Sequence, residues 1–518
     1  MKELVFHRML LPIAERRAGH PAIIDGEYHA TFAEHIDRVL RVAHSLKHQL
    51  QVAPDDRFAV MALNSHQFLE LYHAAFLGAG VVNPLNLRLA PTELAYILKD
   101  SGTSVCFADP FFAGVIDSVR EEAGIETIVL IGEGDAPHDT TYEALVAAGE
   151  PVVPDEPDED DPVVLMYTGG TTGLPKGVLL DQRAEMLNLY HVASTWQMHE
   201  HLVYLHQTPL FHAASMGGIL GVPASGATST IVPVFDVPNV LDVIERDQVS
   251  MTVMVPTMIG MMLQHPEFRP ERIASLEILT YGASPMPGAL LERVLEMLPD
   301  LRVFQGYGMT ESSAVLTALT PDDHRAGGDR LGSAGRAVPG VVLSIQDEDG
   351  TVLSAGETGE VCARAGNFMR EYWHKPDATE EVFRGGWYHT GDAGYLDAEG
   401  YLFLVDRVKD MIVTGGENVY SIEVENAIAT HPAVAQVAVI GIPDDTWGEA
   451  VHAVVVPKEG ATVTGEEITE HVRGTIAGYK IPKSVEIRDE PLPLSGAMKV
   501  LKRELRAPFW GDGDRKVN

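Results

Sequence analysis

The sequence predicts an α/β protein: a large N-terminal domain of layered α/β subdomains plus a β-rich subdomain, then a small α+β C-terminal domain. Three observations predict this class. Strand and helix patterns alternate along residues 200–345, which is typical of layered sheets with mainly parallel strands. From about residue 340 the pattern changes to short strands joined by tight turns. Near the C-terminus, two strand patterns lie between two helix patterns.

Residues 1 to about 150 also alternate between the two patterns. Residues 66–77 carry apolar side chains at helical spacing and end before Gly78. A second helix is predicted over 92–100, with Thr92 as its N-cap. Short strands are predicted at 81–82, where Asn83-Pro84 ends the strand, and at 105–108.

An acidic, proline-rich segment follows at residues 151–162. Its six acidic residues and four prolines cannot pack into a core, so it predicts a solvated linker. Beyond it, strands are predicted at 163–167, 229–233, 250–255 and 277–281, and helices at 240–247 and 288–298.

The C-terminal third shows two different sequence patterns. Antiparallel hairpins are predicted from strand patterns at 341–346, 359–363 and 400–404, with a turn at 348–350. The small domain is expected to contain a helix from Ser421 (as N-cap) to about residue 431, strands at 434–440 and 451–456, and a helix over 464–477. We therefore expect domains at 1–406 and 407–518.

The charge of the chain limits its partners. Its 518 residues include 74 acidic and 38 basic ones, which gives a formal net charge of −36. A field of this sign repels nucleic acid and anionic membranes, so neither is expected as a main partner. Anions must therefore be bound by locally gathered basic groups.

Cysteine usage and hydropathy indicate the compartment. The two cysteines, Cys106 and Cys362, cannot form a disulfide framework, which fits a reducing cytoplasm. The N-terminal segment lacks a small-residue cleavage site and makes a poor signal peptide. No stretch of 18 apolar residues occurs, so no integral membrane segment is expected.

The most informative segment is the glycine- and threonine-rich run at residues 167–177. It follows a predicted strand and carries four glycines, three threonines and Lys176. Glycines let backbone N–H groups approach phosphate oxygens, hydroxyls add donors, and the lysine adds positive charge. The segment is not a Walker A loop, because Pro175 stands where that pattern has glycine before lysine. It predicts a phosphate-binding loop of another kind.

This loop resembles that of the adenylate-forming superfamily, in its acyl-CoA synthetase branch. The resemblance recurs in order along nearly the whole chain, in the motifs Asn83-Pro-Leu-Asn-Leu-Arg88, Pro209-Leu-Phe-His212, Tyr281-Gly-Ala-Ser284, Gln305-Gly-Tyr-Gly-Met-Thr-Glu311, Trp387-Tyr-His-Thr-Gly-Asp392, Asp406-Arg407-Val-Lys409-Asp410, Gly415-Gly-Glu-Asn418 and Pro493-Leu-Ser-Gly-Ala-Met-Lys499.

The resemblance implies a function for each motif. Lys499, Glu311, Thr168 and His212 would be catalytic, and Glu311 would hold Mg²⁺ on the phosphates of ATP. Asp392 would accept hydrogen bonds from the ribose hydroxyls, with Arg407 beside it. The cofactor-binding set implied by the resemblance is Thr168, Gly169, Gly170, Thr171, Thr172, Lys176, Gly282, Ala283, Ser284, Gln305, Gly306, Tyr307, Gly308, Met309, Thr310, Asp392, Arg407, Lys409, Gly415, Gly416 and Lys499.

The small domain is expected to be mobile. By resemblance it rotates about Lys409 between two half-reactions, and Gly415 and Gly416 form part of the channel for CoA. Lys499 is the expected catalytic lysine, with Lys502 as the alternative. The sequence departs from the family here, since Met498 stands where glycine is usual; if that position has positive φ, methionine is strained. At Gly169, where relatives commonly have serine, one phosphate donor is lost.

The implied reaction is ATP-dependent. A carboxylate attacks the α-phosphate to give acyl-AMP and pyrophosphate, and the CoA thiol then displaces AMP. Amino acids are unlikely substrates, because relatives that activate them have aspartate where this chain has His212. Glycine at 308, where acetate-type relatives have tryptophan, predicts a larger acyl group, and residues 216–221 predict small, apolar lining.

Several alternatives stay open at this point. The acid is expected to be a medium or long fatty acid or another bulky apolar carboxylate, with aryl acids as an option. The acceptor is CoA, or else a carrier protein or an amine. A non-catalytic nucleotide-binding protein disabled by Met498 is a third reading, and a homodimer is compatible with all of them.

Overall fold

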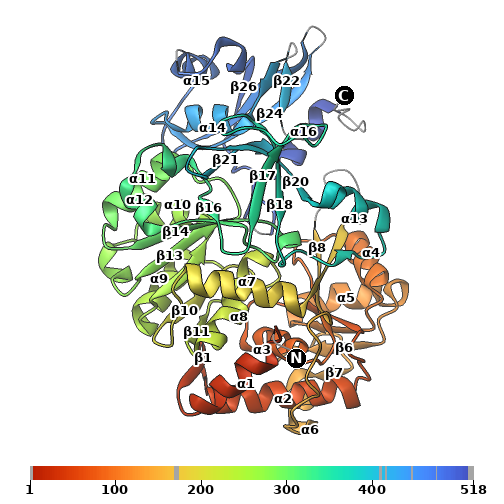
Figure 1. The fold of residues 1–518 in the computed structure, drawn as a ribbon. Helices are drawn as coiled ribbons and strands as arrows, with labels where there is room; N and C mark the ends of the chain where they lie inside the picture. Colours follow the sequence, from red (N-terminus) through yellow and green to blue (C-terminus); the bar gives the residue numbers. More distant parts are fainter. Residues whose placement is uncertain are drawn as a thin grey trace.

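The structure is a computed structural model that describes residues 4–168, 174–407, 411–414, 417–444, 447–473, 475–496 and 498–510. It has a large N-terminal part and a small C-terminal part, which lies at the top of Figure 1. No helix among the described residues is long and apolar enough to cross a membrane.

The first large sheet has eight strands in the order β19-β9-β8-β4-β3-β5-β6-β7. Strands from β8 to β7 pair in parallel, whereas β9 pairs antiparallel with β8 and with β19. Its strands are β3 (Arg57–Met61), β4 (Val81–Pro84), β5 (Val105–Ala108), β6 (Thr127–Leu130), β7 (Thr140–Thr141), β8 (Pro162–Thr168), β9 (Lys176–Asp181) and β19 (Glu371–Tyr372).

The second large sheet has nine strands in the order β16-β15-β14-β13-β12-β10-β11-β1-β2. Its centre, from β14 to β1, is parallel, and both edges are antiparallel. Its strands are β1 (Pro21–Asp25), β2 (Tyr28–Thr31), β10 (Val203–His206), β11 (Thr228–Ile231), β12 (Met251–Met254), β13 (Ile278–Gly282), β14 (Arg302–Tyr307), β15 (Thr317–Leu319) and β16 (Arg336–Ala337).

Helices cover these sheets and fill the space between them. One continuous apolar core joins the two sheets through α2, α3, α7 and α8, and α7 crosses the middle of the molecule in Figure 1. The helices of this part are α1 (His7–Arg16), α2 (Phe32–His48), α3 (His66–Phe76), α4 (Pro91–Ser101), α5 (Pro110–Ala123), α6 (Tyr142–Ala148), α7 (Gln182–Thr195), α8 (Met216–Ser225), α9 (Val237–Asp247), α10 (Pro256–Gln264), α11 (Gly288–Met297), α12 (Pro321–Ala326) and α13 (Pro376–Val382).

A four-stranded antiparallel sheet in the order β17-β18-β20-β21 forms the β-rich subdomain. Its strands are β17 (Val342–Gln346), β18 (Gly359–Arg364), β20 (Tyr388–Leu396) and β21 (Leu402–Arg407). Figure 1 shows it between the large sheets and the C-terminal part. Six short 3₁₀ turns complete the described elements: η1 (Ala213–Ser215), η2 (Pro270–Ile273), η3 (Thr310–Ser312), η4 (Gly328–Gly332), η5 (Arg384–Gly386) and η6 (Gly478–Lys480).

The C-terminal part has its own sheet and its own apolar core. Strands β23-β22-β25-β24 run in that order and β26 adds to β25. Its elements are β22 (Ile412–Thr414), β23 (Glu417–Val419), α14 (Ser421–Ala429), β24 (Val434–Asp444), β25 (Gly448–Pro457), α15 (Gly465–Val472), β26 (Ser484–Ile487) and α16 (Lys502–Trp510). The predicted α/β class, the β-rich subdomain and the small α+β unit are confirmed.

Several predicted helix boundaries were wrong for local reasons. Helix α4 begins at Pro91 and its N-cap is Ala90, because proline favours the first helical position. Ser421 is the first residue of α14 and not its cap. Helix α15 ends at Val472, since Arg473 has extended backbone angles.

The acidic segment at 151–162 is partly anchored and not simply solvated. Arg8 donates a 2.9 Å hydrogen bond to Glu156, and Arg183 pairs with Glu159. The backbone N–H of Leu4 also donates to Glu159 at 3.1 Å. The carboxylates therefore fix this connection against α1 and the start of α7.

Candidate active site

The two ends of the predicted phosphate loop are held together by a β-hairpin. Thr168 ends β8 and Lys176 begins β9, and the two residues face each other in the antiparallel register. The Thr168 hydroxyl donates to the carbonyl oxygen of Lys176 at 3.4 Å. Gly169, Gly170, Thr171 and Thr172 lie outside the described residues, so their roles stay predictions.

Tyr372 connects this loop to the predicted magnesium ligand. The Lys176 ammonium lies 4.8 Å from the centre of the Tyr372 ring, and the Tyr372 hydroxyl donates to Glu311 Oε1 at 2.8 Å. Burial and the neighbouring Glu311 raise the pKa of Tyr372, so the phenol stays protonated and can donate. The sequence analysis missed Tyr372, because β19 meets β9 only in the folded sheet.

The predicted adenine-side turn lies beside the next motif. Gly282 and Gly306 are neighbours in the parallel pairing of β13 and β14. A Cβ on Gly282 would lie 2.3 Å from the Gly306 carbonyl oxygen, so only glycine allows this approach. Ala283 follows with a φ of 64°, and Ser284 continues the turn, whereas Gln305 belongs to β14.

Tyr307 joins this region to the predicted ribose-binding residue. Its hydroxyl donates to Asp392 Oδ2 at 2.7 Å. Asp392 in turn lies opposite Arg407 in the pairing of β20 with β21. The turn before Asp392 is built by Gly391, whose φ is 71°, and by a 3.1 Å hydrogen bond from Asp392 N–H to Thr390 Oγ1.

The loop from Gly308 to Thr310 leads from β14 to Glu311. A Cβ at Gly308 would lie 2.1 Å from the carbonyl oxygen of Ala314. Close backbone packing therefore requires glycine here, and this geometry does not support the inference that Gly308 opens space for an acyl group. Met309 N–H donates to Ser312 Oγ at 3.1 Å, and Thr310 begins the turn η3 that holds Glu311.

His212 lies half-buried immediately before η1. Its Nδ1 accepts a 3.2 Å hydrogen bond from the N–H of Ala214, which caps the turn. Burial lowers the pKa of His212 to about 3, and the nearby positive charge of Lys499 contributes. The imidazole is therefore neutral near pH 7, and Lys499 lies within electrostatic reach of it.

Lys499 lies on a short hairpin whose described residues are 494–496 and 498–500. Leu494 and Val500 form an antiparallel bridge, and the N–H of Ser495 donates to the carbonyl of Lys499 at 2.7 Å. Met498 N–H closes the turn by donating to the carbonyl of Ser495 at 2.9 Å. We call residues 494–496 and 498–500 the lysine hairpin.

The lysine hairpin is docked on the large N-terminal part. Arg88 Nη1 donates to the carbonyl of Leu494 at 2.6 Å, and Thr257 Oγ1 donates to the carbonyl of Met498 at 3.3 Å. A Cβ on Gly496 would lie 2.4 Å from Asn86 Oδ1 and 3.2 Å from the Phe211 ring. The early motif that contains Asn86 and Arg88 therefore receives the hairpin.

The structure also distinguishes the two candidate lysines. Lys502 Nζ donates to Ser421 Oγ at 2.6 Å and pairs with Glu425 at 2.7 Å, inside the C-terminal part. Of these two lysines, Lys499 is the one whose charge acts on His212. Met498 has a φ of 60° and packs against the core that covers β12 and β13, so the strained conformation expected for this position is present.

The three glycines of α8 do not line open space. A Cβ on Gly217 would lie 3.1 Å from Trp196, one on Gly218 would lie 2.7 Å from Tyr204, and one on Gly221 would lie 2.7 Å from Met198 Sδ. The missing side chains accommodate these larger neighbours. The prediction that residues 216–221 supply small lining was therefore wrong for the glycines.

Three remaining predicted residues cannot be placed. Lys409, Gly415 and Gly416 lie outside the described residues. The described residues of the predicted site nevertheless form contact chains, Thr168–Lys176–Tyr372–Glu311 and Tyr307–Asp392–Arg407, which the segment from Tyr307 to Glu311 connects.

Comparisons with known proteins agree with this arrangement. The family described as AMP-binding enzyme matches residues 12–373, and the AMP-binding enzyme C-terminal domain matches residues 423–499. A feruloyl-CoA synthase from an Amycolatopsis species is 39% identical over 491 residues, covering 94% of this chain and 96% of that protein. The fatty acid–[acyl-carrier-protein] ligase ScoC from Streptomyces coeruleorubidus is 37% identical, covering 92% and 91%.

A solved structure resembles the whole fold. ATP-bound MatB from Rhodopseudomonas palustris has a TM-score of 0.88 and 29% sequence identity, and the match covers 98% of this chain and 99% of that one. These findings confirm the resemblance inferred from the motifs.

Proposed function

Because the chain belongs to the AMP-binding enzyme family, in its acyl-CoA synthetase branch, we propose that it is an ATP-dependent acyl-CoA ligase for a bulky apolar carboxylate. It converts the acid to acyl-AMP with release of pyrophosphate and then transfers the acyl group to CoA with release of AMP. The observation that carries this proposal is the docking of the lysine hairpin beside His212.

Residues of the large N-terminal part bind the nucleotide in this proposal. Thr168 and Lys176, with the loop between them, hold the phosphates, while Gly282, Ala283 and Ser284 border the adenine. Asp392 accepts from the ribose hydroxyls, and the hydrogen bond from Tyr307 fixes its carboxylate. Phosphate-binding groups that the fold already holds in position, such as Lys176, cost no reorganisation when charge develops on the reacting phosphate.

Glu311 is the residue that would hold Mg²⁺. Its Oε1 accepts a hydrogen bond from Tyr372, which orients the carboxylate toward the side of the site where Lys176 lies. Carboxylate oxygens are ligands that Mg²⁺ prefers, and a metal ion on ATP phosphates offsets their negative charge. The residues present therefore fit the ion.

Lys499 supplies positive charge where two anions must meet. The substrate carboxylate and the α-phosphate repel each other, and a cation between them stabilises the transition state. Because His212 is neutral, it does not compete with Lys499 for the carboxylate. For the second step we propose that a domain of residues 407–518 rotates about Lys409 and that Gly415 and Gly416 border the entering CoA.

The acid is proposed to be apolar and to lack an α-amino group. An ammonium group beside the neutral His212 would have no opposite charge there, and an unpaired charge removed from water costs several kcal/mol.

The inner limit of the acyl site is proposed to be Trp196. Its ring lies between Gly306 of β14 and Gly217 of α8, where added Cβ atoms would be 3.5 Å and 3.1 Å from it. In this proposal the indole closes the end of the acyl pocket that begins at His212. This packing and the 39% identity to a feruloyl-CoA synthase favour a compact aromatic acid over an extended fatty acid.

A panel of acids tests the proposal. Purified protein with ATP, Mg²⁺ and CoA is offered acetate, octanoate, palmitate, benzoate and 4-hydroxycinnamate, and pyrophosphate and the thioester are measured. We expect acid-dependent pyrophosphate release, fastest with an aromatic acid and poor with acetate. Pyrophosphate release that no acid stimulates would refute the ligase function, whereas palmitate as the best substrate would refute only the role of Trp196.

A carrier-protein ligase is the second candidate, because ScoC is 37% identical over most of the chain. The acceptor is decided by replacing CoA with a phosphopantetheinylated carrier protein. We expect AMP release to depend on CoA. Transfer to the carrier alone would assign the second function.

A further inference from the structure

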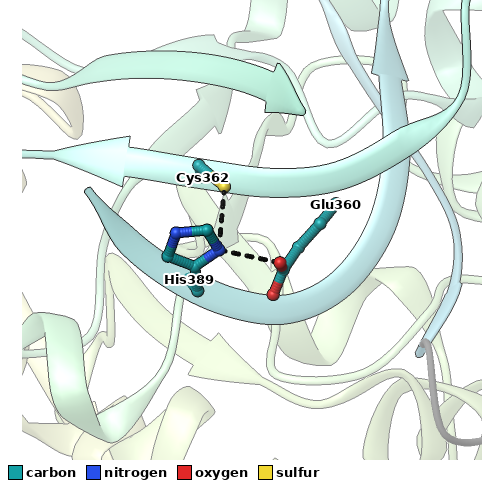
Figure 2. A group of neighbouring side chains, drawn as sticks. All are labelled: Glu360, Cys362 and His389. Atoms are coloured by element: carbon teal, nitrogen blue, oxygen red, sulfur yellow. Dashed lines mark hydrogen bonds and ion pairs between the residues drawn. The ribbon is translucent and has the colours of Figure 1, made fainter. Parts of the chain in front are cut away.

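Three side chains with metal-binding atoms meet in the β-rich subdomain, outside the contacts described for the nucleotide. Glu360 and Cys362 lie two residues apart on β18, and His389 lies directly opposite Cys362 on β20. Figure 2 shows all three side chains converging on one face of this strand pair. Cys362 and His389 are buried, and the Glu360 side chain is 21% exposed.

One nitrogen atom faces both partners. His389 Nδ1 lies 3.4 Å from Cys362 Sγ and 2.8 Å from Glu360 Oε2. A single N–H on this nitrogen cannot point at both the sulfur and the carboxylate oxygen with good hydrogen-bond geometry. A cation with directional ligands can bind the nitrogen, the sulfur and the carboxylate oxygen at once.

We propose that Glu360, Cys362 and His389 form a binding site for a thiophilic divalent cation, with Zn²⁺ as the best-fitting ion. In tetrahedral zinc sites, bond lengths near 2.3 Å to sulfur and 2.05 Å to nitrogen or oxygen place sulfur and nitrogen about 3.6 Å apart and nitrogen and oxygen about 3.3 Å apart. The observed 3.4 Å matches the first separation. The second requires Glu360 Oε2 to move outward by about half an ångström.

The charges balance when the ion binds. Burial raises the pKa of Cys362 to about 12, so the thiol is protonated without metal and loses one proton to the solvent on binding. Ligation by His389 Nδ1 would place the single ring proton on Nε2 in the metal-bound state. The thiolate and the carboxylate then neutralise the two charges of the ion, and water completes the coordination from the exposed side of Glu360.

Binding would alter the turn that holds Asp392. Glu360 Oε1 accepts a 3.2 Å hydrogen bond from Gly391 N–H, and Oε2 pairs with Arg384 at 2.9 Å. Arg384 is half exposed and can turn to solvent. The Gly391 N–H belongs to the backbone of β20 and cannot turn away in this manner. A movement of the Glu360 carboxylate would therefore pull on Gly391, the residue next to Asp392. We therefore expect the bound metal ion to weaken ATP binding and so to inhibit the enzyme.

Cobalt substitution tests the site directly. The full-length protein is titrated with Co²⁺, whose tetrahedral thiolate complexes have intense near-ultraviolet charge-transfer absorption. We expect one equivalent to produce this absorption, Zn²⁺ to abolish it, and a Cys362→Ser variant to lack it. Absence of the absorption in the wild-type protein would overturn the proposal, and this result does not depend on whether any variant folds.

Matched variants assign the ligands. Cys106→Ser removes the other buried cysteine, which lies on β5, and should keep the full cobalt spectrum. His389→Gln should weaken Zn²⁺ binding at least about tenfold, as expected for loss of a ligand. A spectrum lost in Cys106→Ser and retained in Cys362→Ser would refute the assignment.

A kinetic readout tests the link to Asp392. With ATP as the varied substrate, one equivalent of Zn²⁺ should raise its KM in the wild type and in Cys106→Ser but not in Cys362→Ser. Equal inhibition of all three would place the inhibitory metal elsewhere and overturn the proposed coupling.

Discussion

The hydroxyl of Tyr307 donates a 2.7 Å hydrogen bond to the carboxylate of Asp392, across 85 residues of sequence. This contact brings together two sequence motifs, one on β14 and the other on β20, so that their side chains lie side by side. It also contributes to the orientation of this carboxylate at the proposed ribose site. The position of the acceptor for the ribose hydroxyls thus depends on a residue of another sheet.

Tyr307→Phe should therefore weaken ATP binding without changing the fold. Loss of a hydrogen bond to a charged group costs about 1.5 kcal/mol or more, so we expect the KM for ATP to rise about tenfold. Steady-state kinetics at saturating acid measure it. Tyr395→Phe, at a half-exposed position further along β20, is the control and should leave the KM for ATP unchanged. An unchanged KM in Tyr307→Phe would show that Asp392 is held adequately without this contact.

Lys499→Ala should abolish most of the first half-reaction. Removing a cation from the reacting charges is expected to slow acyl-AMP formation by about 100-fold or more. Lys502→Ala is the matched control, because Lys502 is paired with Glu425 and Ser421. Pyrophosphate release distinguishes them, and equal losses in both variants would contradict the assignment of Lys499.

Gly496→Ala should interfere with docking of the lysine hairpin. The added Cβ would approach Asn86 Oδ1 to 2.4 Å and the Phe211 ring to 3.2 Å. Misplacing Lys499 by about 1 Å is expected to slow acyl-AMP formation by about 100-fold. Conversion of preformed acyl-AMP to thioester should be retained.

Gly478→Ala is the control for that substitution, because a Cβ there meets nothing within 4 Å. Both half-reactions of this variant should equal those of the wild type. If Gly496→Ala slowed both half-reactions equally, the effect would not come from hairpin docking.

Stability should fall as the pH falls from about 6.5 toward 3, partly because of buried histidines. Burial lowers the pKa of His206 to about 3, whereas the ordinary value is 6.5. Between these values the unfolded chain takes up a proton that the folded protein excludes, which costs about 1.4 kcal/mol per pH unit for one such group. The stabilisation is thus present above pH 6.5 and lost on acidification.

The pH dependence of the urea-unfolding midpoint measures this contribution. His206→Gln should show a shallower decline between pH 6.5 and 4 than the wild type. His201→Gln, at a side chain that is 79% exposed, should parallel the wild type. Parallel curves for all three proteins would mean that His206 is not titrating on unfolding.

Trp196→Ala should change which acids are accepted. In the proposed site, removing the indole from between Gly306 and Gly217 lengthens the acyl pocket that begins at His212. We expect kcat/KM for octanoate to rise at least about tenfold relative to that for benzoate. An unchanged ratio would show that the acyl group does not reach this tryptophan.

Much of the fold and of the site could be predicted from the sequence, because the information is local. The strand before Thr168 and the glycine turn before Asp392 each lie in a short segment whose residue types fit one chemistry. The helix ends were less predictable: at α4, Pro91 rather than Thr92 decides where the helix starts.

The remainder depends on contacts between distant segments. Neither Tyr372 nor the pairing of Cys362 with His389 has a local signal, since strand register alone brings them to their partners. Gly308 illustrates the opposite error. A missing side chain in a sequence does not reveal whether the space is open or, as here, occupied by the backbone at Ala314.

The contact between Arg88 and Leu494, 406 positions apart, has a consequence for how the protein is made. During synthesis the nucleotide-facing segments leave the ribosome long before residue 499 is added. A nascent chain can therefore fold the segments proposed to bind ATP while it still lacks Lys499, the proposed catalytic lysine. With Lys499 as the catalytic lysine, we expect incomplete chains to bind nucleotide without consuming it.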